Sequence, residues 1–154
     1  MADIRPFRGI LYNTEKVGIA DVVAPPYDVI SPQQQQELYE RSPYNVVRVI
    51  LGREQDPYTS AATCLVHWLK EGILQQDARA AMYFVSQEFG IADRTRVVRQ
   101  GIIAACRLEE FGKGSVFPHE RTLSGPKEDR FKLFQSTQTM FSQILSLYGD
   151  RDHI

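Results

Sequence analysis

Runs of apolar residues predict five strands along the chain. Residues 46–51 form an almost continuous β-branched run, which is typical of a buried central strand. Residues 101–106 form an apolar run, and we expect it to be buried and to pair in a hairpin with the strand that contains Phe84 and Val85. The predicted strands cover residues 5–11, 46–51, 81–90, 96–107 and 143–148.

Capping signals predict where the first long helix begins and ends. Ser31 is a favoured N-cap residue, and Pro32 suits the first helical position because it lacks an N–H group. Gln34 completes a capping box. We expect this helix to end near Ser42, just before Pro43.

A second helix is predicted after Asp56 and Pro57, which repeat the pattern of cap followed by proline. Its apolar residues recur at helical spacing, and Gly72 suits the position just past its end. The members of the apolar stripe are Tyr58, Ala61, Ala62, Leu65 and Leu69.

A third helix is predicted over residues 127–139, after a Gly-Pro break. Pro126 is expected at its first position, with Ser124 capping or preceding that turn, and Phe131 and Phe134 share one face. Three helices with a hairpin indicate an α+β fold with a mixed, partly antiparallel sheet. We expect residues 1–154 to form a single domain.

Composition narrows the functional classes. The chain has 154 residues, of which 43% are hydrophobic and 24% charged, as in soluble globular proteins. Eighteen basic against 19 acidic residues give no field that favours nucleic acid or a membrane surface. Without a signal-peptide pattern, we expect a cytoplasmic protein in which Cys64 and Cys106 are reduced and buried.

The densest chemistry lies in residues 117–130. The loop from residue 119 to 124 leads into a helix N-terminus, where free N–H groups and the helix dipole favour anions. Basic and hydroxyl side chains in the same stretch can contact phosphate oxygens. The candidate anion-binding residues are Arg121, Thr122, Ser124, Lys127 and Arg130.

Three residues are candidates for catalysis. His119 titrates near neutral pH and could act as an acid, a base or a phosphoryl acceptor. Glu120 follows it, and Asp28 stands beside the stiff Pro25-Pro26 segment, so either carboxylate could hold a divalent ion. No Walker A or G-x-G-x-x-G motif is present, so the pattern names no cofactor and no metal-ligand set.

Each of these residues also has a purely structural interpretation. Residues 117–130 could be a polar loop followed by a surface helix, with ion pairs among Glu128, Asp129, Lys127 and Lys132. The Pro25-Pro26 segment could be a rigid edge rather than a pocket wall. Arg48 could face solvent, which we favour, or reach an anion or a carboxylate.

Four segments, in the same order along the chain, resemble the DUF1015 family of bacterial and archaeal proteins of unknown function. They are Ile4-Arg5-Pro6-Phe7-Arg8-Gly9, Val23-Ala24-Pro25-Pro26-Tyr27-Asp28-Val29-Ile30-Ser31, Ser42-Pro43-Tyr44-Asn45-Val46-Val47-Arg48 and His119-Glu120-Arg121-Thr122-Leu123-Ser124-Gly125-Pro126-Lys127-Glu128-Asp129-Arg130.

The resemblance implies that the chain corresponds to the N-terminal part of longer family proteins. If so, we expect it to expose an unusually large apolar patch or to pair with itself. Residues 140–143 depart from the family pattern, because they keep its serine and lose its proline.

Two functions are compatible with these features. The first is an enzyme that acts on a small phosphorylated or anionic metabolite, with phosphoryl transfer as one reaction. The alternative is a non-catalytic module that senses a nucleotide or anion, or that binds another protein. The two differ in one requirement, since only the enzyme needs an acid or base placed beside the anion.

Overall fold

The computed structural model describes residues 2–91, 96–110, 112–118 and 124–149. Its elements in chain order are β1 (Ile4–Arg5), β2 (Ile10–Tyr12), α1 (Ile19–Val22), the 3-10 helix η1 (Tyr27–Val29), α2 (Pro32–Arg41), α3 (Val47–Ile50), α4 (Pro57–Lys70), β3 (Leu74–Gln76), β4 (Tyr83–Gly90), β5 (Arg96–Ile103), β6 (Ala105–Cys106) and α5 (Ser124–Thr137).

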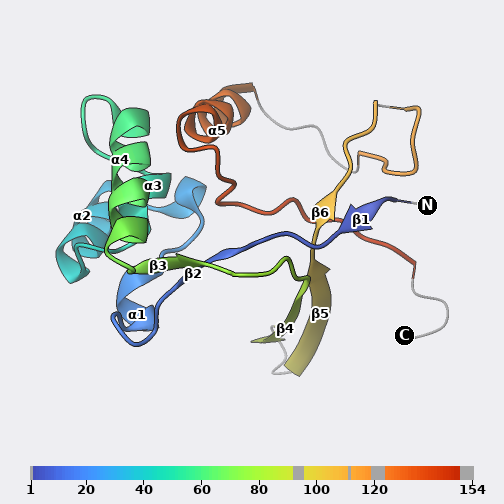
Figure 1. The fold of residues 1–154 in the computed structure, drawn as a ribbon, viewed down its shortest axis with the longest axis horizontal. Coiled ribbons are helices and arrows are strands. Elements are labelled where there is room, and N and C mark those ends of the chain that lie inside the picture. The colour runs from blue at the N-terminus through green and yellow to red at the C-terminus, as the bar shows by residue number, and fades with distance from the viewer. Residues whose placement is uncertain (1, 92–95, 111, 119–123, 150–154) are drawn as a thin grey trace.

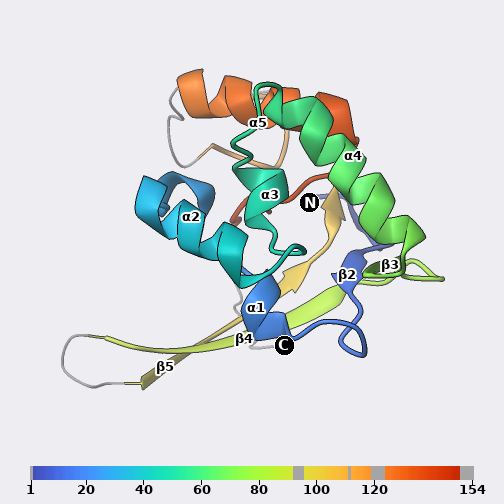
Figure 2. The same cartoon turned by 90° about the vertical axis from the view of Figure 1, so that its left-hand side faces the viewer.

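The predicted α+β class is confirmed. The three long helices α2, α4 and α5 lie together with the short helices, while the β4–β5 hairpin projects away from them (Figures 1 and 2). Among the described residues, the strands form three separate antiparallel pairs, β1 with β6, β2 with β3 and β4 with β5, in place of one mixed sheet. The predicted first strand is accordingly divided into β1 and β2.

The main core lies where α4 meets its neighbours. Leu65 and Trp68 of α4 are buried against Val49 of α3, Leu74 of β3 and Leu133 of α5. Aliphatic and aromatic side chains buried to this extent each stabilise the fold by about 1.5–3 kcal/mol. This core therefore holds α3 and α5 against the same helix and fixes the spacing between them.

Both predicted N-caps are confirmed. The Ser31 side chain accepts a hydrogen bond from the Gln34 N–H at 3.2 Å, and α2 ends at Arg41. The Asp56 carboxylate accepts from the Thr59 N–H at 3.1 Å, and Gly72 adopts a left-handed φ of 69° just past α4. Local hydrogen bonding thus specifies these helix ends directly.

The predicted strand over residues 46–51 is wrong, because the structure places the helix α3 there. Asn45, which is fully buried, accepts a hydrogen bond from the Val47 N–H at 3.0 Å. Its amide also donates to the Asp21 and Val23 carbonyls at 2.8 and 3.0 Å. These bonds turn the backbone into a helix in spite of its β-branched composition.

The predicted hairpin is confirmed, but its burial is not. Phe84 pairs with Ile102 and Val85 with Gly101 in an eight-residue antiparallel register. Phe84 and Ile102 are nevertheless 68% and 55% exposed, so residues 101–106 are not the buried central strand that we expected. The hairpin lacks a covering layer among the described residues, which leaves an exposed apolar surface on this ribbon.

The C-terminal third also departs from the prediction. The described part of α5 covers Ser124–Thr137, so Ser124 is itself helical and Pro126 lies two residues further along the helix. Phe131 and Phe134 are exposed, and the buried face of α5 carries Leu133 and Thr137 instead. Residues 143–148 form no strand.

Both cysteines are free thiols, as expected. Cys64 is half-buried in α4, and burial raises the pKa of its thiol. Cys106 is exposed on β6, so the prediction that both side chains are buried is wrong for this residue.

Candidate functional site

The candidate anion-binding residues that the structure describes lie on one face of α5. Ser124, Lys127 and Arg130 follow one another at three-residue spacing, which aligns side chains along a helix. Ser124 and Lys127 are exposed, and Arg130 is half-buried. Pro126 lies near the described start of α5 and has no N–H group, so any N–H groups there that lack an intrahelical partner belong to its neighbours.

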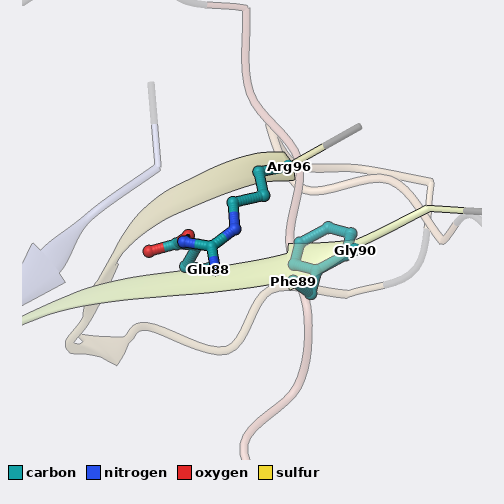
Figure 3. Close-up of a pocket in the computed structure, with 4 residues that line it drawn as sticks. All are labelled: Glu88, Phe89, Gly90 and Arg96. Atoms are coloured by element: carbon teal, nitrogen blue, oxygen red, sulfur yellow. Dashed lines mark hydrogen bonds and ion pairs between the residues drawn. The ribbon is translucent and has the colours of Figure 1, made fainter. Parts of the chain in front are cut away.

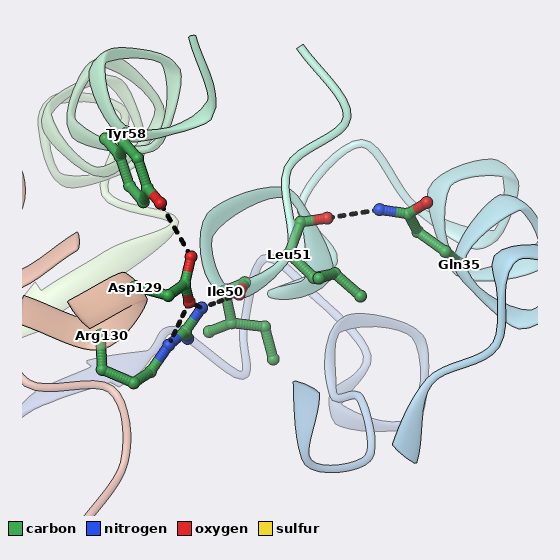
Figure 4. Close-up of polar contacts among 6 residues, drawn as sticks. All are labelled: Gln35, Ile50, Leu51, Tyr58, Asp129 and Arg130. Atoms are coloured by element: carbon green, nitrogen blue, oxygen red, sulfur yellow. Dashed lines mark hydrogen bonds and ion pairs between the residues drawn. The ribbon is translucent and has the colours of Figure 1, made fainter. Parts of the chain in front are cut away.

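Arg130 is the centre of a polar junction between α5, the end of α3 and η1. Figure 4 shows its bonds to Asp129 and to Ile50. Its guanidinium Nη2 donates to the Ile50 carbonyl at the end of α3, at 2.8 Å. Its Cζ lies 3.9 Å from the centroid of the Tyr27 ring in η1. A guanidinium stacked on a ring in this way contributes about 0.5–2 kcal/mol.

Asp129 links Arg130 to α4. Arg130 Nε donates to Asp129 Oδ2 at 2.8 Å, and Nη2 donates to the same oxygen. The Tyr58 hydroxyl donates to Asp129 Oδ1 at 2.8 Å. This hydrogen bond, together with partial burial, raises the pKa of the Tyr58 hydroxyl. Both oxygens of the carboxylate are therefore engaged.

One donor at this junction has no partner among the described residues. Arg130 Nη1 is buried, although the whole Arg130 side chain is still 23% exposed. A cavity of about 50 Å³ lies between the end of α3, the start of α4 and α5, and its lining includes Gly52, Tyr58 and Arg130. A cavity of this size accepts one or two water molecules or one end of a ligand.

The junction brings two of the sequence segments together. Tyr27 contacts Arg130, so Asp28, which is exposed in η1, lies one residue from the contact with α5. Through Tyr27, the segment that follows Pro25-Pro26 contacts α5. His119, Glu120, Arg121 and Thr122 lie outside the described residues.

Some of the predicted surface ion pairs are present. Lys132 Nζ lies 2.8 Å from Glu128 Oε1 on the exposed side of α5, and this pair lowers the pKa of Glu128 and raises that of Lys132. Asp129 does not join these pairs, since it turns inward to Arg130 and Tyr58. The helix therefore has a solvated side and a side that belongs to the junction.

Arg48 does not face solvent, which corrects our preferred interpretation. It is half-buried, and its Nη2 donates to the Tyr39 carbonyl at 2.7 Å. Its Cζ also lies 4.3 Å from the Tyr39 ring centroid, with Arg53 at 4.1 Å from the same centroid. The partners of Arg48 are thus backbone carbonyls and an aromatic ring, and its role is structural.

A second hollow, of about 530 Å³, lies beside the β4–β5 hairpin (Figure 3). It is lined by Glu88, Phe89, Gly90 and Arg96. Arg96 Nη1 lies 2.6 Å from Glu88 Oε1, so the charge of the arginine is compensated on the hairpin itself. Arg99 likewise donates to Gln87 within the hairpin. Both arginines therefore have partners on the hairpin itself.

Within the described ranges there is no group of three or more His, Cys, Asp or Glu side chains placed to hold a metal ion. The same residues include no helix with the length and hydropathy needed to cross a membrane.

Sequence reasoning did not find the roles of Tyr58 and Asp129. Tyr58 belongs to an apolar stripe at helical spacing, and this pattern conceals that its hydroxyl has a polar partner. The two residues are 71 positions apart, so no local spacing rule relates them. The only indication of this contact in the sequence is that polar residues flank Arg130, and that pattern predicts surface ion pairs equally well.

The fold and the junction define an α+β protein in which α5, η1 and the end of α3 meet at Arg130. The family model described as a protein of unknown function (DUF1015) matches residues 4–154, and the chain therefore belongs to this family. No curated protein and no solved structure matches the chain.

Proposed function

We propose that the chain binds a small phosphorylated or otherwise anionic metabolite at the start of α5. The observation that carries this proposal is the alignment of Ser124, Lys127 and Arg130 on one helix face that ends at a buried guanidinium donor without a partner among the described residues. Such donors are costly unless an acceptor reaches them. An oxyanion near the first turn supplies acceptors to the helix N–H groups and to these cations.

The remaining candidates extend this site. Arg121 and Thr122 precede the helix in sequence and would bring a bidentate cation and a hydroxyl donor to the same anion. Asp28, His119 and Glu120 are then the residues available for acid or base catalysis. The proposed enzyme acts in the cytoplasm on a phosphorylated or otherwise anionic substrate, and phosphoryl transfer is one reaction open to it, because a histidine can serve as acid, base or phosphoryl acceptor.

Calorimetric titration with inorganic phosphate tests the site. Lys127→Ala and Arg121→Ala should each weaken binding about tenfold to a hundredfold, because a charge-assisted contact contributes about 1.5–3 kcal/mol. Lys132→Ala is the matched control, since Lys132 lies on the same helix but pairs with Glu128. It should change the affinity by less than about threefold, as expected for a screened surface charge.

Equal affinities in the wild type, Lys127→Ala and Arg121→Ala proteins, with circular dichroism unchanged, would remove the site. The alternative function, a non-catalytic sensor of a nucleotide or anion, predicts the same losses of phosphate affinity in these variants as the enzyme does. It differs only in catalysis, which the effect of His119→Ala on turnover decides.

A further inference from the structure

Asp129 presents to Arg130 the same chemical group that an anionic ligand would present. The Nε and Nη2 atoms of a guanidinium form the edge that carboxylates and phosphates engage with two hydrogen bonds. In the structure both atoms donate to Asp129 Oδ2. The anion-binding edge of Arg130 is therefore already occupied by a neighbouring side chain.

Asp129 has a second partner that does not depend on Arg130. Tyr58 lies in the first turn of α4, and its hydroxyl donates a hydrogen bond of 2.8 Å to Asp129 Oδ1. When Oδ2 leaves the guanidinium, the carboxylate keeps this hydrogen bond, and its side chain, 39% exposed in the structure, can also be hydrated. The cost of separating Asp129 from Arg130 is reduced accordingly, since the carboxylate is not left buried without a partner.

Arg130 is likewise held in place without Asp129. Nη2 donates to the Ile50 carbonyl, and the guanidinium rests on the Tyr27 ring. These contacts fix the plane of the group, and Nη1 adds a buried donor without a partner among the described residues. An oxyanion that replaces Asp129 would meet a guanidinium that is already oriented.

We propose that Asp129 is a built-in competitor for Arg130, which an oxyanion ligand displaces from the guanidinium edge while Asp129 remains on Tyr58. The inference rests on the proposed function, since it concerns the same site. Asp129 then sets the affinity of the site: it holds Arg130 neutralised until a ligand with sufficient charge replaces it.

The test compares Asp129→Asn with Glu128→Gln in calorimetric titrations with inorganic phosphate. The asparagine in Asp129→Asn can still accept from Tyr58, but it lacks the charge that competes for Arg130. We expect this variant to bind phosphate at least about tenfold more tightly than the wild type, because one negative charge a few ångströms from the anion is removed. Glu128→Gln removes the same charge from the adjacent residue, which pairs with Lys132, and should change the affinity less than about threefold.

An unchanged or weaker affinity in Asp129→Asn would overturn the competitor role while leaving the proposed function intact, provided that Lys127→Ala still weakens binding. An equal gain in both variants would also overturn it, because the effect would then be one of net charge alone. No binding of phosphate by the wild type or by Asp129→Asn would remove both proposals. Binding by Asp129→Asn alone would support the competitor role.

Discussion

Asn45→Ala is expected to lower the free energy of unfolding by at least about 3 kcal/mol. Asn45 is fully buried. Its side chain accepts a hydrogen bond from the Val47 N–H and donates to the carbonyls of Asp21 and Val23. Truncation leaves these three backbone groups without their partner, and each such group costs about 1–3 kcal/mol. Equilibrium denaturation followed by circular dichroism measures the difference.

Asn13→Ala is the matched control for this experiment. Asn13 is half-buried and makes the same kinds of bond, from its amide to the Gly72 carbonyl and from the Glu15 N–H to its oxygen. Water can replace these contacts, so we expect a loss of about 1 kcal/mol. Similar losses for the two variants would contradict the view that Asn45 determines the local fold around α3.

His119→Ala is expected to separate catalysis from binding. If the protein is an enzyme, the variant should bind phosphate as the wild type does but release phosphate from phosphorylated metabolites about a hundredfold to ten-thousandfold more slowly. The control is His67→Ala, because His67 lies on the exposed side of α4, 3.3 Å from Glu71. We expect the rate of this variant to be unchanged.

The alternative function makes a different prediction for the same assay. A sensor needs no acid or base, so the wild type would release no phosphate and His119→Ala would bind normally. A rate reduced equally in the two histidine variants would contradict the assignment of His119 as the catalytic group.

Local signals in the sequence were sufficient for the helix ends. Ser31 and Asp56 cap their helices through residues three positions away, and such bonds can be inferred from spacing alone. The hairpin pairing was likewise predictable, since β4 and β5 are joined by a short connection.

Elements that depend on distant contacts could not be predicted in this way. Residues 46–51 have strand propensity, but the bonds from Asn45 to residues more than 20 positions away impose a helix. The apolar run at 101–106 predicts burial, yet no described element covers the hairpin face. Propensity reports only the local preference, which tertiary contacts override.

The candidate site was predicted in part. Sequence spacing alone places Ser124, Lys127 and Arg130 three residues apart on a predicted helix, and the structure confirms that the three residues belong to one helix. The contact of Arg130 with Tyr27 and Ile50 joins segments that are far apart in sequence, so only the fold reveals it. The same holds for Asp129, whose partner Tyr58 belongs to another helix.

The most direct test of the anion site is the position of a bound oxyanion. Crystals soaked with tungstate, a tetrahedral oxyanion with strong anomalous scattering, would locate it without prior assumptions. We predict an anomalous peak beside the first turn of α5. The tungstate should contact Lys127 and lie on the side of the helix that faces Arg130. Peaks confined to other surfaces, such as the hairpin arginines, with none at the start of α5, would contradict the proposed function.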